Sequence, residues 1–109
     1  MDKPYVRIAA PADIPPGTLK RFRVNGHDFL VANVDGTHYA VDDTCSHEDF
    51  SLSYGCLEGD RVKCSLHGSR FCLKTGQPQE EPADEPIGTY RLQVEDDGLW
   101  LDPSAPTNL

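Results

Sequence analysis

Two turn dipeptides, Asn25-Gly26 and Asp35-Gly36, constrain the fold of this chain most strongly. Asn, Asp and Gly tolerate the backbone conformation of tight two-residue turns, so each pair favours a β-hairpin. The segment before the first turn, LKRFRV, alternates apolar and basic residues as a half-buried strand does. The sequence therefore predicts an antiparallel meander with strands at 19–24, 27–34 and 37–41.

The rest of the chain also reads as short strands joined by sharp turns. Residues 60–64 follow the Glu58-Gly59 turn and are expected to pair with 69–73, and Asp97-Gly98 is expected to turn the last hairpin. No segment has a 3.6-residue apolar period over ten residues, although a short helix near 11–17 or 50–54 stays open. A chain of 109 residues favours one domain. The predicted class is all-β, a small antiparallel sandwich or barrel, with further strands at 5–9, 89–95 and 99–103 and an irregular loop at 77–86.

The formal net charge of −8 bears on partners. A surface with this charge repels phosphate backbones and anionic lipid, so we expect neither nucleic-acid nor membrane binding. It suits docking onto basic patches of partner proteins, or it simply keeps the protein solvated. No apolar run approaches the roughly 18 residues of a membrane span, and the N-terminus has no apolar signal core. We therefore expect a cytoplasmic protein with reduced thiols, which favours metal binding over disulfides.

Four metal-ligating side chains occur as two short motifs, Cys45-Ser46-His47 and Cys64-Ser65-Leu66-His67. A strand-turn-strand layout can bring the two motifs together at one end of a sheet. A structural zinc ion accepts two Cys and two His, but zinc fingers usually place both cysteines in one arm. Here each arm carries one of each, which suits a [2Fe–2S] cluster with two thiolates on one iron and two imidazoles on the other. A zinc site remains the alternative.

These motifs, with Gly68 after the second histidine, resemble the ligand signature of Rieske iron–sulfur proteins. The sequence LEGDRVKC, the Thr75-Gly76 turn and a proline-bearing loop before a last hairpin are similar to the small Rieske ferredoxins. The resemblance implies a single Rieske [2Fe–2S] domain over 1–109. Its cluster-binding part, about 43–74, would be inserted in a β-sandwich base and would present two loops at one end.

The resemblance also implies residue roles and partners. Cys45 and Cys64 would ligate the buried iron, and His47 and His67 the outer iron that is reduced. The chain would carry one electron from an NAD(P)H-dependent flavin reductase to a terminal aromatic-ring-hydroxylating oxygenase, docking transiently with both. It would be an electron carrier without a substrate site of its own. The alternatives are a small subunit of another redox enzyme, such as a nitrite reductase, a zinc-stabilised interaction module, or a fragment of an oxygenase subunit.

Two departures from the high-potential respiratory subtype bear on the reduction potential. The extra cysteines of that subtype are replaced by Phe50 and Leu66, and its tyrosine by Phe71, which has no hydroxyl to donate to a ligand sulfur. Ser69 stands where a hydroxyl can reach cluster sulfur in those relatives. Fewer hydrogen bonds to sulfur predict a low potential, on the order of −150 mV. Of the other cysteines, Cys56 and Cys72 are expected to be small, buried or half-buried side chains, and His27 and His38 to be exposed hairpin residues. Pro82 or Pro86 is a candidate to shield the cluster.

Overall fold

The computed structural model describes residues 5–44, 51–63, 70–79, 86–95, 97–104 and 106–107. Its central sheet confirms the predicted meander. Strands β2 (Leu19–Val24), β3 (His27–Val34), β4 (Thr37–Asp42) and β8 (Thr89–Tyr90) are ordered β2-β3-β4-β8. Asn25 and Gly26 have φ angles of 52° and 80°, and Asp35 and Gly36 have 51° and 94°. Positive φ at both turn positions matches the twist of the flanking strands, which explains the two tight hairpins.

A second sheet closes the sandwich, with β1 (Val6–Ala9), β10 (Gly98–Leu101) and β9 (Leu92–Glu95) in the order β1-β10-β9. Two details of the prediction were wrong here. Gly98 pairs with Glu95, so it belongs to strand β10 rather than to the turn, and Asp97 precedes the strand with a φ of 57°. The predicted strand 89–95 is divided at Arg91, where the chain leaves the central sheet and enters the second one.

A third, small sheet contains β5 (Cys56–Glu58), β6 (Arg61–Lys63) and β7 (Arg70–Cys72) in sequence order. The β6–β7 hairpin was predicted, but β5 was not. Because Glu58 pairs with Arg61, the β5–β6 turn is formed by Gly59 and Asp60 rather than by Glu58 and Gly59. The short helices left open are single 3-10 turns, η1 (Pro11–Asp13) and η2 (Leu52–Tyr54).

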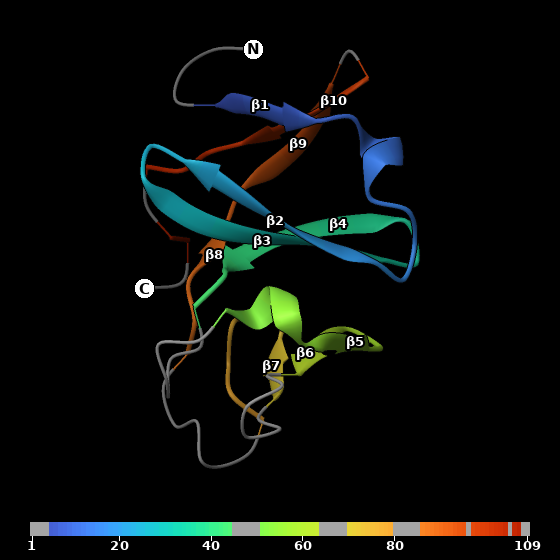
Figure 1. Cartoon of the computed structure of the whole chain (residues 1–109), viewed down its shortest axis with the longest axis vertical. Helices are drawn as coiled ribbons and strands as arrows, with labels where there is room; N and C mark the ends of the chain where they lie inside the picture. The colour runs from blue at the N-terminus through green and yellow to red at the C-terminus, as the bar shows by residue number, and fades with distance from the viewer. Residues whose placement is uncertain are drawn as a thin grey trace.

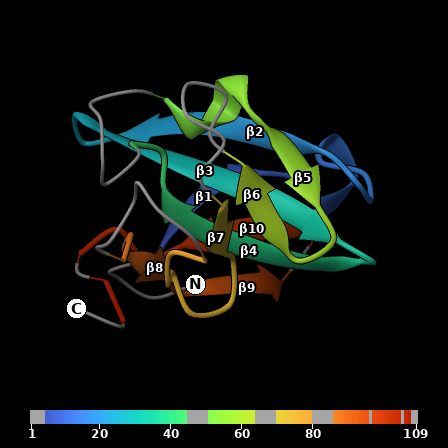
Figure 2. The same cartoon turned by 90° about the horizontal axis from the view of Figure 1, so that it is seen from below.

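The central sheet lies between the other two, as Figure 1 shows, because β3 is apolar on both faces. Phe29 and Val31 pack toward Leu99 and Leu101 of the second sheet, whereas Leu30 and Ala32 join a separate core. The core that contains Leu30 and Ala32 lies between the central sheet and the small sheet. It also includes residues from the small sheet and its flanks, namely Leu52, Val62, Phe71, Leu73 and Ile87. We call the central and second sheets together the base. Seen from below, the small sheet covers part of the central sheet (Figure 2).

The all-β class is confirmed. In the part of the chain that the structure describes, the antiparallel sheets are interrupted only by 3-10 turns. Within that part of the chain, no helix has the length and apolar character needed to cross a membrane.

Candidate metal centre

The four predicted ligands, Cys45, His47, Cys64 and His67, lie outside the described residues. The structure does define where the two ligand-bearing segments start and end. Segment 45–50 lies between Thr44 and Ser51, which form an antiparallel bridge. Segment 64–69 lies between Lys63 and Arg70, which pair in the β6–β7 ladder. We call these two residue pairs the first root and the second root.

A close backbone approach at Gly55 brings the chain that follows the first root against the second root. This glycine follows η2 and precedes Cys56, which pairs with Lys63 of the second root. A Cβ atom on Gly55 would overlap the carbonyl oxygen of Lys63. Only glycine allows this contact without a shift of the backbone. The chain that follows the first root through η2 therefore packs directly against the second root, as a metal site shared by the two predicted ligand segments requires.

A third segment, 80–85, starts and ends at the same place. The Gln79 amide donates to the Arg70 carbonyl at 2.7 Å, beside the second root. At the other end, the Gly88 amide donates to Oδ2 of Asp42 at 2.8 Å, close to the first root. Pro82 lies outside the described residues, and Pro86 is half-buried. Shielding of the cluster by either proline stays a prediction.

Charged side chains surround the second root. The Arg70 Nε atom donates to Oε1 of Glu58 at 2.7 Å, and the Lys63 Nζ atom lies 3.8 Å from Oε2 of the same carboxylate. The hydrogen bond from Arg70 is the main cause that lowers the pKa of Glu58 below its ordinary value, and the nearby charges of Arg70 and Lys63 add to it. One carboxylate thus neutralises cations on both strands that lead into segment 64–69.

Sequence reasoning missed a polar group at the first root. Asp43 is only 1 % exposed, and its side chain contacts Ser51 and Ser53 on the far side of segment 45–50. An aspartate beside a turn normally suggests a solvated surface, and nothing local in the sequence indicates its burial. The sequence signal that could have found Gly55 is equally weak, because an isolated glycine indicates only a bend or a close approach.

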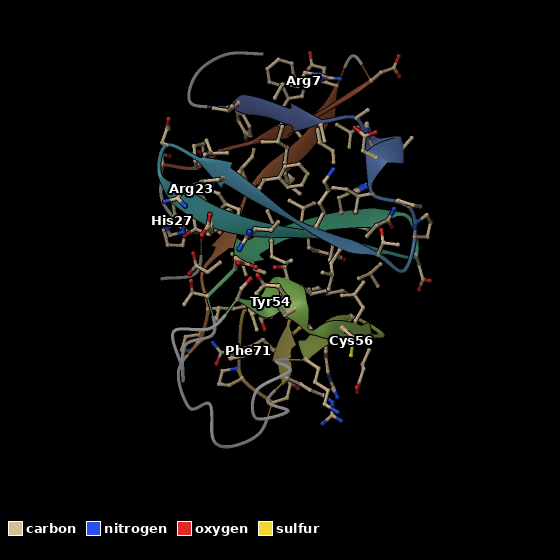
Figure 3. All side chains as sticks on the ribbon, in the orientation of Figure 1. Arg7, Arg23, His27, Tyr54, Cys56 and Phe71 are labelled. Atoms are coloured by element: carbon tan, nitrogen blue, oxygen red, sulfur yellow. The ribbon has the colours of Figure 1, made fainter. Side chains whose placement is uncertain are left out.

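The remaining cysteines and histidines have other surroundings. Cys56 is exposed at the edge of the small sheet (Figure 3), so its predicted burial was wrong. Cys72 is half-buried as predicted, and both are free thiols. Burial raises the pKa of Cys72, but hydrogen bonds with Thr75 and Lys74 outweigh it and leave the pKa lowered. His27 lies 2.9 Å from Asp42 and packs on Phe29, on the base. His38 is half-buried rather than exposed as predicted, and its Nε2 atom lies 3.2 Å from the carbonyl oxygen of Ile14.

The donor set fits a [2Fe–2S] cluster with mixed ligands. Two thiolates and two imidazoles are carried by two segments whose roots adjoin, and each segment supplies one donor of each kind. Among the described residues, no three His, Cys, Asp or Glu side chains group into a second metal site.

Comparison with known proteins places the chain in a family. Residues 4–91 match the model of the Rieske [2Fe-2S] domain, so the chain belongs to that family and its cofactor is a Rieske [2Fe–2S] cluster. Its relatives are ferredoxins. The chain is 41% identical over 96 residues to the ferredoxin component of biphenyl 2,3-dioxygenase of Rhodococcus jostii (strain RHA1). The match covers 88% of this chain and 90% of that protein.

Two further comparisons agree. The 3-phenylpropionate/cinnamic acid dioxygenase ferredoxin subunit of Shigella flexneri serotype 5b is 42% identical over 92 residues, covering 84% of this chain and 86% of that protein. Among solved structures, a chain in the complex of reduced oxygenase and oxidized ferredoxin of carbazole 1,9a-dioxygenase has a TM-score of 0.88 and 32% identity. The match covers 95% of this chain and 97% of that one.

Proposed function

We propose that this chain is the ferredoxin component of an aromatic-ring-hydroxylating dioxygenase system. It accepts one electron from an NAD(P)H-dependent flavin reductase and delivers it to the terminal oxygenase. The single observation that carries the proposal is the pair of mixed Cys/His motifs on adjoining roots, in a chain that aligns over nearly its full length with ferredoxins of such systems. The oxygenase partner is supported by the ferredoxin–oxygenase complex among the similar structures.

In this proposal, Cys45 and Cys64 hold one iron and His47 and His67 hold the other. The cluster, when bound, supplies reversible one-electron transfer. The chain supplies the fixed ligand positions, shields the cluster and presents the histidine side to a partner. We place the protein in the cytoplasm, as a single Rieske domain over 1–109 with the cluster-binding part at about 43–74. The net charge of −8 supports rapid, salt-sensitive docking with basic partner surfaces.

Reconstitution tests this function. The purified holoprotein is mixed with a flavin reductase, NADH and a biphenyl-type terminal oxygenase, and oxygenated product is measured with and without the ferredoxin. We expect product only with all three components, at a rate that falls as salt is raised. The reductase could instead reduce a holoprotein that supports no oxygenase turnover but supports a nitrite reductase. That result would favour the alternative role, as a small subunit of another redox enzyme.

The colour and metal content of the purified protein separate the cluster from zinc. We expect a red-brown protein that contains two irons per chain. A colourless protein with one zinc ion per chain would contradict electron transfer altogether. The predicted low potential, on the order of −150 mV, is measured on the same material, and a clearly positive midpoint would contradict it.

A further inference from the structure

Asp43 stands out among the buried groups of the described residues. It is 1 % exposed, and the other buried polar side chains there are those of Asn33 and Thr89, which are uncharged. Burying a carboxylate costs free energy unless hydrogen bonds or a cation compensate it. Asp43 stands directly before the first root and two residues before Cys45 in the sequence. This position points to a role of the buried carboxylate at the cluster.

The contacts of Asp43 tie the two ends of segment 45–50 together. Ser51 Oγ donates to Oδ2 at 2.5 Å, and the Ser53 amide donates to Oδ1 at 3.0 Å. The main chain adds a second tie, because the Leu52 amide donates to the Asp43 carbonyl at 2.5 Å. The Asp43 amide in turn donates to the Asp28 carbonyl at 3.3 Å, which anchors the assembly on β3. Asp43 thus joins the described residues on the two sides of segment 45–50 through both its side chain and its main chain. We call these contacts the clamp.

The clamp uses neutral donors only. The hydroxyl of Ser51 and the amide of Ser53 carry no net charge, and no ion pair of Asp43 occurs within the described part of the chain. The neighbouring Asp42 differs, since it lies 2.9 Å from His27 and receives the Tyr90 hydroxyl. The negative charge of Asp43 is therefore left uncompensated by these contacts. In a poorly screened interior, such a charge acts on any nearby redox centre.

We propose that Asp43 is a positioning residue for the first ligand-bearing segment and a fixed negative charge that lowers the reduction potential of the cluster. Reduction adds one electron to the cluster, and a buried negative charge nearby opposes that addition. The inference rests on the proposed ligand set, because Asp43 stands two residues before Cys45 in the sequence. Two features of the protein would then lower the reduction potential: the buried charge of Asp43 and the small number of hydrogen bonds to the cluster sulfurs.

Two substitutions in the holoprotein separate the two roles. In Asp43→Asn, the amide oxygen can still accept from Ser53, and the amide nitrogen can donate to Ser51 Oγ, so the clamp is kept while the charge is lost. In Ser51→Ala, the charge is kept and one tie of the clamp is lost. Asp28→Asn is the matched control, because it removes the same charge from a side chain that is 33% exposed.

The midpoint potential and the rate of iron release to a chelator are measured for each protein. We expect Asp43→Asn to shift the midpoint to more positive values while Asp28→Asn leaves it near the original value. Ser51→Ala should leave the midpoint nearly unchanged and speed iron release about tenfold, as for a lost hydrogen bond to a charged group. Asp43→Ser provides a second measure of the charge effect if the Asn variant retains too little cluster to titrate.

Equal midpoints for Asp43→Asn and Asp28→Asn would overturn the electrostatic role. Iron release from Ser51→Ala at the original rate would overturn the positioning role. Failure of the proposed function is distinguishable from both results. In that case the original protein would itself lack a mixed-ligand cluster, which is measured before any variant is compared.

Discussion

The base and the small sheet differ in how far each can be stable by itself. The meander of the base has strands of 6, 8 and 6 residues joined by tight turns, and the base encloses an apolar core between its two sheets. The strands of the small sheet have 3 residues each, and Val62 and Phe71 on its inner face are buried against Leu30 and Val41 of the base. Short strands need such support. The comparison teaches that the ligand-bearing part depends on the base, and on its metal, more than the base depends on it.

Removal of a ligand is the strongest way to break this comparison. His67→Ala should lose the cluster or hold it only weakly, because one iron would lack a donor, while the base stays folded. Iron content and visible absorbance report the cluster, and amide hydrogen exchange of β2 to β4 reports the base. His27→Ala is the control and should keep the cluster. A stable, unchanged cluster in His67→Ala means that the ligand assignment is wrong, and an unfolded base means that the two regions are not separable.

A backbone clash at the roots should have the next largest effect. Gly55→Ala places a Cβ on the carbonyl oxygen of Lys63 and must push the two roots apart. Overpacking of this kind costs about 1–3 kcal/mol in the free energy of unfolding. Thermal unfolding and iron release are measured together, and we expect faster iron release along with the lower stability. Unchanged iron release at lowered stability would show that the spacing of the roots does not matter to the cluster.

A change within the base should leave the cluster alone. The Tyr90 hydroxyl donates to Oδ1 of Asp42 at 2.7 Å, and Tyr90→Phe should cost about 1 kcal/mol of stability at neutral pH. Burial, and then the hydrogen bond and the charge of Asp42, raise the pKa of Tyr90 above its ordinary value. The raised pKa means that this stabilisation is present below about pH 10 and is lost as the pH rises further.

Denaturant unfolding of Tyr90→Phe and the original protein at pH 7 and above pH 10 measures this difference. The difference in the free energy of unfolding between the two proteins should become smaller at alkaline pH. Their midpoint potentials should agree at pH 7. A gap that widens with pH would contradict the assigned hydrogen bond.

The smallest effect is expected at the exposed ion pairs of the small sheet. Glu58→Gln removes the carboxylate that accepts from Arg70. Because the pKa of Glu58 is lowered in the folded protein, its stabilisation is present above the ordinary value of 4.5 and is lost as the pH falls through the lowered value. The melting temperatures of Glu58→Gln and of the original protein are compared at pH 7 in low and in high salt. They should differ slightly in low salt and agree in high salt. A difference that persists in high salt would contradict an electrostatic origin.

Local turn chemistry made the meander of β2, β3 and β4 predictable. Asn25-Gly26 and Asp35-Gly36 each determine a hairpin by themselves, so the strands they join were found at their actual residues. The sheet exchange at Arg91 could not be predicted, because the residues on both sides continue one alternating pattern. Strand β5 has only 3 residues and is recognisable only through its pairing with β6.

At the candidate centre, the motifs alone predicted the ligand residues, which lie outside the described part of the chain. The supporting residues could not be predicted in the same way. Asp43 is buried by tertiary packing, and Gly55 is required by a contact with Lys63 that no local pattern contains. Spacing in the sequence therefore predicts metal ligands, an assignment that stays a prediction, whereas the residues on the two sides of the predicted ligand segments are recognised only in the fold.

Pulsed EPR of the reduced holoprotein, prepared with and without ¹⁵N-labelled histidine, tests the mixed-ligand cluster most directly. We predict that two histidine nitrogens couple to the reduced iron and that both couplings change on labelling. The absence of any histidine nitrogen coupling, as in a cluster with four thiolates, would contradict the account.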